Sequence, residues 1–195
     1  MMDILVAATK NKGKLLEFKN MLERESFKIV SLLDFPNIEI FETGKTFNEN
    51  ALLKATTVVK KTGYPALADD SGLEVTALNG KPGIFSARYA GVNATDEDNI
   101  KKLLSEMKNI PANQRQARFV CSLALVFPNG KTILEQGTLE GFITDKPRGE
   151  KGFGYDPVFF IPALGKTLSE ISTDEKNRIS HRAKALSKLK KRLFS

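Results

Sequence analysis

The chain of 195 residues lacks the features that mark secreted, membrane or zinc-finger proteins. Its one cysteine, Cys121, excludes an intramolecular disulfide framework and a cysteine-based zinc finger, and fits a reducing compartment. The longest apolar runs, residues 4–8 and 123–127, are too short to span a bilayer. The first three residues, Met-Met-Asp, carry no basic-then-apolar leader, so we expect a cytoplasmic protein with no membrane partner.

Positive charge is concentrated in one terminal segment. The formal net charge is +7, and residues 174–195 hold eight Lys and Arg against two acids. The rest of the chain holds 22 basic and 21 acidic residues, so it is nearly neutral. A nucleic-acid groove usually draws its charge from several elements of a fold, and we therefore expect no nucleic-acid partner. Apolar residues recur every three or four positions from Ile179 to Leu193, which predicts an amphipathic helix whose charges over residues 188–192 face water.

Apolar periodicity and turn residues predict an α/β fold with a mixed sheet. Strands are expected at residues 4–8, 28–32, 66–68, 116–127, 131–143 and 158–161, and helices at 14–22, 46–61, 95–107 and 174–195. The first strand, helix and strand form a β-α-β start, and Asn129-Gly130 predicts the turn of a long hairpin. No repeat or long linker divides the chain. We expect one domain (residues 1–195) of elongated form, with two lobes sharing a nucleotide cleft on an antiparallel hairpin platform.

The segment after the first predicted strand has the composition of an anion site. It consists of Thr9, Lys10, Asn11, Lys12, Gly13 and Lys14. Backbone N–H groups at a helix start attract anions, and lysines add charge. The segment is not a Walker P-loop, because the first glycine is missing and Leu15 stands where a Mg²⁺-binding Ser or Thr would be. An ordinary basic surface turn is the competing interpretation.

Two adjacent carboxylates follow the third predicted strand. Asp69 and Asp70 precede Ser71 and Gly72, and adjacent carboxylates that stay together usually have a cation or solvent between them. Mg²⁺ binds through one or two carboxylates plus substrate phosphates, and Glu42 and Glu49 are the further acids we would bring near. The competing interpretation is an ordinary turn, since Asp, Ser and Gly all favour turns.

The segment Gly152-Phe153-Gly154-Tyr155-Asp156-Pro157 combines backbone freedom with aromatic rings. An exposed Phe153 with a polar neighbour is a common way to hold a nucleobase. Alternatively, Phe153 and Tyr155 lie in the core.

The one histidine, His181, stands in the basic terminal helix. Lys176, Ser180 and Lys184 lie four apart and are therefore predicted to share one face of that helix. A lone histidine is more often structural than catalytic, but His181 and Arg182 have the donors and acceptors to bind a base edge.

Five motifs in order resemble the inosine/xanthosine triphosphate pyrophosphatase family. They are Thr-x-Asn-x-Gly-Lys, Ala-Asp-Asp-Ser-Gly-Leu, Pro-Gly-Ile-Phe-Ser-Ala-Arg-Tyr-Ala-Gly, Gly-Phe-Gly-Tyr-Asp-Pro and Ser-His-Arg, and the match runs over residues 6–186. The resemblance implies a homodimeric, Mg²⁺-dependent enzyme that cleaves ITP, dITP and XTP to the monophosphate and pyrophosphate, and so removes deaminated purines from the nucleotide pool. Lys10 and Lys12 depart from the pattern, because many relatives have Gly and a small residue there.

The resemblance also implies roles for individual residues. Asp70 resembles the catalytic base and a metal ligand, and Glu42 the second metal ligand. Substrate-binding roles fall on Thr9, Lys10, Asn11, Lys12, Gly13, Lys14, Ser71, Phe153, Gly154, Tyr155, Asp156, Lys176, His181 and Arg182. Lys176 and Arg182 would donate hydrogen bonds to the O6 of a 6-oxo purine. They would leave the amine of adenine, which is itself a donor, without a partner. Three rival functions are a pyrophosphatase for other nucleotides, a nucleic-acid-binding module and a nucleotide sensor without turnover.

Overall fold

The fold is described from a computed structural model over residues 3–22 and 27–194. A seven-stranded sheet has the strand order β2-β1-β3-β4-β5-β6-β7. Its strands are β1 (Asp3–Ala7), β2 (Phe27–Ser31), β3 (Ala66–Val75), β4 (Gln116–Val126), β5 (Thr132–Ile143), β6 (Phe159–Ile161) and β7 (Lys166–Thr167). β1 pairs in parallel with β2 and β3, whereas β6 pairs antiparallel with β5 and β7. The predicted mixed α/β sheet is therefore confirmed.

The helices are α1 (Lys12–Leu22), α2 (Phe47–Thr62), α3 (Asp96–Glu106), α4 (Thr173–Ile179) and α5 (His181–Phe194). Thr46 caps α2 by accepting a hydrogen bond from the Glu49 amide, and Thr95 and Asp98 form the predicted capping box of α3. The hairpin turn between β4 and β5 is closed by a hydrogen bond from the Phe127 amide to the Lys131 carbonyl, with Gly130 at φ +87°. Local side-chain caps thus mark the starts of α2 and α3, and the predicted Asn129-Gly130 turn joins β4 to β5.

The chain divides into two compact units. Unit 1 comprises Met1–Asp70, Cys121–Gly137 and Arg182–Ser195, and unit 2 comprises Ser71–Val120 and Thr138–His181. Each unit has its own apolar core. The nucleotide cleft expected between two lobes stays a prediction.

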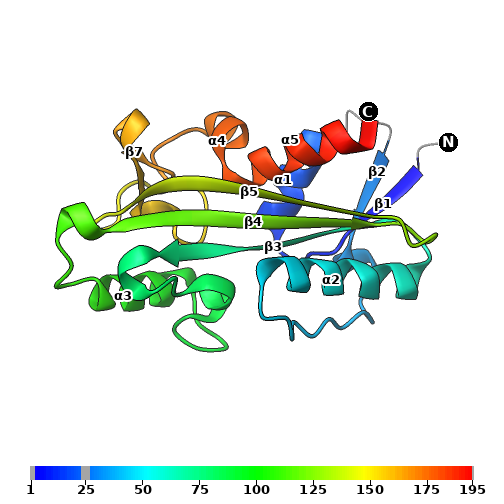
Figure 1. Cartoon of the computed structure of the whole chain (residues 1–195), viewed down its shortest axis with the longest axis horizontal. Coiled ribbons are helices and arrows are strands. Elements are labelled where there is room, and N and C mark those ends of the chain that lie inside the picture. Colours follow the sequence, from blue (N-terminus) through cyan, green and yellow to red (C-terminus); the bar gives the residue numbers. More distant parts are fainter. Residues whose placement is uncertain (1–2, 23–26, 195) are drawn as a thin grey trace. The chain divides into compact units, whose positions relative to one another are not determined.

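The core of unit 1 has two layers, one on each face of its strands. Helices α1 and α5 lie on one side of the strands and α2 lies on the other (Figure 1). Leu5, Ala7 and Leu67 belong to the cluster that includes α1 and α5 residues, whereas Val6 and Ala66 belong to the cluster with α2 residues. This alternation follows from the period of two in a strand, which sends successive side chains to opposite faces.

The core of unit 2 is a single apolar cluster. It joins Leu73 and Val75 of β3, Leu103 of α3, and Phe159 of β6, and it includes the buried ring of Tyr155. Rings from β4 and β6 meet within it, with the centroids of Phe119 and Phe159 4.6 Å apart.

Two expectations about the elements are wrong. The third strand does not stop at residue 68 but runs to Val75, so Asp69, Asp70 and Ser71 lie in a strand and not in a turn. Burial of nine-tenths or more at both aspartates shows that the pairing and packing of the sheet outweigh their turn preference.

The terminal segment, predicted as one helix, also differs: it forms two helices. Ser180 ends α4 with φ −62° and ψ 158°, an extended conformation, and α5 begins at His181. The helical spacing that placed Lys176, Ser180 and Lys184 on one face therefore does not apply. Within the described residues, 3–22 and 27–194, no helix is both long enough and apolar enough to cross a membrane.

Candidate active site

Strand β3 carries two adjacent carboxylates that point to opposite faces of unit 1. Asp69 contacts Lys14 of α1, Arg182 of α5 and Cys121 of β4. Asp70 contacts residues of α2. The repulsion expected between neighbouring carboxylates is thus reduced by geometry, because the strand sends them into different layers with different cations.

Asp69 is the centre of a buried ion-pair network. Its side chain is fully buried, with Arg182 Nε 3.0 Å from Oδ2 and Cys121 Sγ also 3.0 Å from Oδ2. The Lys14 ammonium pairs with Oδ1, and Nη1 of Arg182 continues the network to Glu17 of α1. Burial alone would raise the pKa of Asp69, but Arg182 and Lys14 outweigh it and hold that pKa well below its ordinary value. Asp69 is therefore a fixed negative charge.

Lys14 links this network to the predicted anion-binding segment. The Asn11 side chain accepts a hydrogen bond from the Lys14 amide at 3.0 Å, which caps α1, and the Thr9 hydroxyl accepts one from the Asn11 amide at 3.1 Å. The middle of the segment is exposed (Lys10, Asn11 and Lys12), whereas its two ends are half-buried (Thr9, Gly13 and Lys14). Gly13 lies in the first turn of α1. The segment therefore combines a helix N-terminus with three lysines, which suits an anion.

Asp70 is held beside a second carboxylate by a shared lysine. The Lys54 Nζ atom lies 2.8 Å from Oδ1 of Asp70 and 3.1 Å from Oε1 of Glu42. Burial raises the pKa of Asp70 above its ordinary value, and Lys54 offsets this only in part. The pKa of Lys54 is also raised, because Asp70 and Glu42 outweigh the effect of its burial. The three groups form a compact charge cluster with Glu42 at its exposed side.

Asn50 orients the Asp70 carboxylate. Its Nδ2 donates to Oδ2 of Asp70 at 3.2 Å, while its Oδ1 accepts from the Gly44 amide at 2.8 Å. The second bond fixes which end of the amide faces Asp70. A Cβ atom at position 44 would lie 2.7 Å from Oδ1 of Asn50, so only glycine permits this approach. Glu49, considered as a further acid, accepts from the Lys45 amide at 2.7 Å and does not join the cluster.

The aromatic segment of unit 2 is held by a buried lysine and aspartate. Lys176 Nζ pairs with Oδ2 of Asp156 and lies 4.4 Å from the centroid of the Phe153 ring. The same Asp156 oxygen accepts from the Phe153 amide at 3.0 Å. Gly152, at φ +83°, leaves no room for a Cβ beside that carboxylate. The half-buried Phe153 ring and the Lys176 ammonium thus form one rigid unit.

Other predicted substrate-binding residues have contacts within the protein. Tyr155 is buried and donates its hydroxyl to the Ser86 carbonyl at 2.8 Å, and the Gly154 amide donates to Asp96 at 2.7 Å. His181 stacks on Phe119 with centroids 4.8 Å apart, and Ser71 is half-buried in β3. Arg182 belongs to unit 1, whereas Lys176, Asp156 and Phe153 belong to unit 2.

The sequence analysis missed Lys54, Asn50 and Glu17. Asn50 and Lys54 lie four apart in α2 on a stripe of buried positions with Phe47, Ala51 and Val58. Polar residues on an otherwise apolar helical stripe were the signal that could have found them. Glu17 gave no comparable signal, because its neighbour in the fold, Arg182, is far away in the sequence.

Carboxylate oxygens could hold a divalent cation, and lysines could hold an anionic ligand beside it. In the described part of the chain, no three His, Cys, Asp or Glu side chains gather into a metal-holding group. Glu42 and Asp70 both contact the Lys54 ammonium, so their carboxylate oxygens already face a shared positive charge. This set fits Mg²⁺, which binds through one or two carboxylates and takes further oxygens from phosphates and water.

These clusters place paired carboxylates and lysines within an α/β fold, a combination that suits phosphorylated ligands. The comparison with known proteins is more specific: the chain belongs to the Ham1 family, whose model matches residues 5–192. Two proteins named dITP/XTP pyrophosphatase, from Halalkalibacterium halodurans and Geobacter sulfurreducens, are each 53% identical to it over 187 and 190 residues. The alignments cover 95% and 97% of this chain and 96% of each relative.

Solved structures agree with this assignment. The chain is similar to a HAM1 protein from Coxiella burnetii, with a TM-score of 0.90, 44% identity and coverage of 98% of both chains. It is also similar to a nucleoside-triphosphatase / dITP/XTP pyrophosphatase from Mycobacterium abscessus, with a TM-score of 0.78, 42% identity and coverage of 95% of this chain and 98% of that one. The family resemblance read from the motifs is confirmed.

Proposed function

We propose that this protein hydrolyses ITP, dITP and XTP to the nucleoside monophosphate and pyrophosphate, and so removes deaminated purines from the nucleotide pool. The relatives' names support the reaction and the substrate class. The observation that carries the proposal is the β3 arrangement, in which Asp69 holds the lysine of the anion-binding segment while Asp70 stands beside Glu42. A cytoplasmic homodimer remains part of the proposal on the strength of the resemblance.

Glu42 and Asp70 would hold Mg²⁺ together with the phosphates of the substrate. The cation, when bound, lowers the charge on the triphosphate and polarises the phosphoryl group that is attacked. Lys54 lies within contact distance of both carboxylates, so it keeps them close together before a substrate arrives.

Asp70 would act as the base in the hydrolysis. A water oxygen forms a bond to phosphorus as the bond to the leaving pyrophosphate breaks, and the water proton passes to the Asp70 carboxylate. The raised pKa of Asp70 makes it a stronger base than an ordinary aspartate. Lys14 and the amides at the start of α1 would stabilise negative charge on the phosphates. Asp69 holds Lys14 in position for this role.

Unit 2 supplies groups suited to a purine base. The Phe153 ring offers a stacking surface, and Lys176 offers a donor suited to the O6 of a 6-oxo purine. Asp156 keeps both in place by pairing with Lys176 and accepting from the Phe153 amide. Ser71, Gly154, Tyr155, His181 and Arg182 remain proposed substrate contacts.

The decisive test is turnover of ITP, XTP, dITP, GTP and ATP with Mg²⁺, scored for pyrophosphate and orthophosphate. We expect pyrophosphate from the first three and little product from GTP and ATP. Asp70→Asn should lower kcat about 10²- to 10⁴-fold, because the general base is lost. The matched control, Glu140→Gln on the exposed side of β5, should leave kcat unchanged. Release of orthophosphate, binding without turnover, or near-normal turnover by Asp70→Asn would refute the mechanism.

A further inference from the structure

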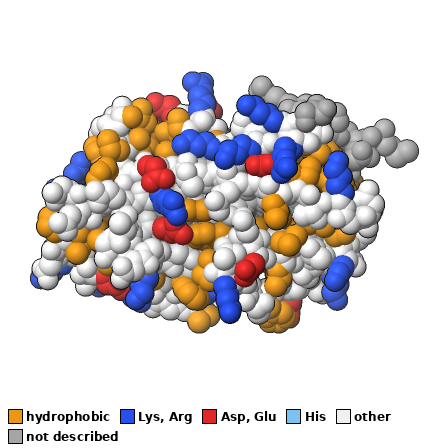
Figure 2. All heavy atoms as spheres, viewed as in Figure 1, with side chains coloured by type: hydrophobic (Ala, Val, Ile, Leu, Met, Phe, Trp, Pro, Cys, Tyr) orange, Lys and Arg blue, Asp and Glu red, His pale blue; other side chains and the backbone are white. Residues whose placement is uncertain are grey.

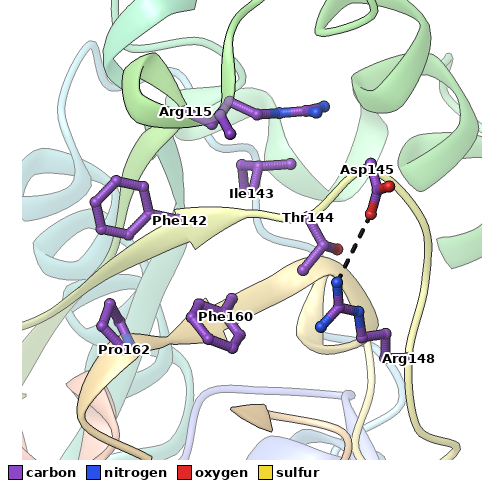
Figure 3. A pocket seen from close by; sticks show the side chains of 9 residues that line it. Arg115, Phe142, Ile143, Thr144, Asp145, Arg148, Phe160 and Pro162 are labelled. Carbon is purple, nitrogen blue, oxygen red and sulfur yellow. Dashed lines mark ion pairs between the residues drawn. The ribbon is translucent and has the colours of Figure 1, made fainter. Parts of the chain in front are cut away.

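Unit 2 contains a cavity that the proposed reaction does not use. Its volume is about 500 Å³, and its lining comes from the start of β4, the end of β5 and the neighbourhood of β6. Figure 3 shows Arg115, Phe142, Thr144, Arg148 and Phe160 around it. None of these residues takes part in the clusters around Asp69, Asp70 or Asp156. A volume of this size is typical of sites for small organic molecules.

Arg115 is the unusual member of the lining. It is 91% buried, since its exposed fraction is 9%, and its Nε atom is buried with no hydrogen-bond partner. Over residues 3–22 and 27–194, no carboxylate or carbonyl accepts a hydrogen bond from its side chain or forms an ion pair with it. A buried N–H without an acceptor is costly, and proteins nearly always satisfy such groups. The guanidinium therefore has unused capacity for an anion inside this cavity.

The backbone around Arg115 is held in place. Its carbonyl accepts from the Ile143 amide at 2.9 Å, which ties the start of β4 to the end of β5. Thr144, beside it, already donates its hydroxyl to the Lys146 carbonyl at 2.8 Å and so offers no free donor. The backbone that carries Arg115 is thus anchored at the wall of the cavity.

The other walls supply an aromatic surface and a second positive charge. Phe142 and Phe160 are directly paired across β5 and β6, so their side chains stand on the same face of the sheet. Arg148, at the rim, is exposed, and its Nη2 lies 3.8 Å from Asp145 in a loose ion pair. Both the Arg148 amide and carbonyl are hydrogen-bonded, to Pro157 and Thr167 respectively. The cavity thus combines ring surface, the guanidinium of the mostly buried Arg115 and, at the rim, the loosely paired Arg148 and Asp145.

We propose that this cavity binds a small organic anion made of one flat ring system and one carboxylate or phosphate group. The anionic group pairs with Arg115 and the ring lies against Phe142 and Phe160. Arg guanidinium groups match carboxylate and phosphate geometry with two parallel hydrogen bonds, which suits either anion. The site lies apart from the residues assigned to hydrolysis, so the proposal does not depend on the pyrophosphatase reaction.

Isothermal titration calorimetry with four probes tests the ligand class. Phenyl phosphate and benzoate carry the ring and the anion, inorganic phosphate lacks the ring, and benzyl alcohol lacks the charge. We expect phenyl phosphate, benzoate or both to bind at millimolar concentrations or below, and more tightly than the other two probes. The stronger of the two identifies the phosphate or the carboxylate as the preferred anion. Equal binding of benzyl alcohol or inorganic phosphate, or no binding of either aromatic anion, would overturn the proposal.

Variants of two arginines locate the binding. Arg115→Met should weaken the aromatic anion about tenfold to a hundredfold, because a charged hydrogen-bond partner is removed. Arg118→Gln removes an exposed guanidinium from the same strand, where it pairs with Glu74 at 2.7 Å, and should leave the affinity unchanged. If Arg115→Met binds phenyl phosphate as the parent does, the anion binds elsewhere and the proposal fails.

Thermal unfolding without ligand separates this role from a structural one. Replacing an unpaired buried charge by an apolar side chain of similar length should leave the midpoint unchanged or raise it by about 2–4 °C. A clear drop in the midpoint for Arg115→Met would mean that Arg115 serves the fold, and would count against the proposed site.

Discussion

At the scale of single residues, Asp69 shows what a buried charge needs in order to persist. Its carboxylate is fully buried and lies against Arg182, Lys14 and the Cys121 thiol. The same neighbours act on the cysteine: burial and the adjacent Asp69 raise the pKa of Cys121 well above its ordinary value. Cys121 is therefore a thiol that supports Asp69 and not a nucleophile.

Replacing Asp69 by Asn should expose how much this network stabilises the fold. Asn would leave Arg182 buried beside a neutral group, and breaking a buried ion pair in this way costs about 3–5 kcal/mol. Because the pKa of Asp69 is lowered on folding, its contribution is fully present above the unfolded value of 3.8 and is lost as the pH falls below it. Urea unfolding should therefore show a large loss at pH 7 that narrows on acidification below pH 3.8.

The control for this measurement is Asp145→Asn, whose side chain is 70% exposed and only loosely paired. It should change the free energy of unfolding by less than about 0.5 kcal/mol at either pH. A gap between parent and Asp69→Asn that stayed constant with pH would contradict the ionised state assigned to Asp69.

The sequence predicted a cation or solvent between Asp69 and Asp70. Strand β3 instead directs the two carboxylates to separate cations on opposite faces. The apolar stripe of α2 could have marked Lys54 as buried, but its partners depend on α2 packing against the strand, a contact that no local pattern contains. Tyr155 and His181 were equally ambiguous, since buried aromatic groups serve both cores and ligands.

At the scale of elements, the loop before α2 supports the cluster of Asp70, Glu42 and Lys54, the proposed active site, through a single glycine. Gly44→Ala would bring a Cβ within 2.7 Å of Oδ1 of Asn50 and 2.8 Å of the Glu49 Cβ, so the loop or Asn50 must move. Since Asn50 orients Asp70, we expect kcat for dITP to fall about tenfold or more, in line with losses seen when a positioning contact is displaced.

Gly130→Ala is the matched comparison in the β4–β5 turn. Gly130 has φ +87° and open space around it, so alanine there strains the backbone without touching the active-site cluster. We expect a loss of about 1–2 kcal/mol in the free energy of unfolding with kcat unchanged. If Gly44→Ala behaved in the same way, the coupling of Gly44 to Asp70 through Asn50 would be disproved.

Element boundaries were predictable where a side chain defines them locally. Thr95 and Asp98 signal the start of α3 in four residues, and the structure has that capping box. The break at Ser180 was not predictable, because apolar residues keep a helical spacing through it while the backbone turns extended. The length of β3 was missed for a related reason: pairing within the sheet, and not residue preference, decides where that strand ends.

At the scale of the whole molecule, the terminal segment that carries most of the net charge of +7 holds both buried and exposed cations: Lys176 and Arg182 are buried and Lys188 is exposed. Lys and Arg side chains are scattered over the face seen in Figure 2, with acidic and hydrophobic side chains between them. Within unit 1, Lys188 of α5 donates to the Gln136 carbonyl at 2.7 Å and Arg192 pairs with Glu135 at 3.1 Å. Part of the terminal charge is therefore used to hold α5 against β5.

The double variant Lys188→Gln/Lys191→Gln tests whether the exposed charges of α5 bind a nucleic acid. Removing two of the terminal charges should leave turnover of dITP within about twofold, since both residues lie outside the proposed site and surface charges contribute little. Binding of the parent protein to duplex DNA and to RNA, followed at several salt concentrations, should be weak. Tight binding that falls steeply with salt and is lost in the double variant would instead favour the nucleic-acid-binding alternative.

The alternation along β3 also limits how the chain can change its length. A strand reverses the direction of every later side chain when one residue is inserted or deleted. One extra residue between Ala68 and Asp69 would turn Asp69 toward Lys54 and Asp70 toward Arg182, exchanging the two electrostatic environments in a single step. A change of length is therefore tolerated better in the loops on either side of β3 than in the strand itself, which admits substitutions but no change of register.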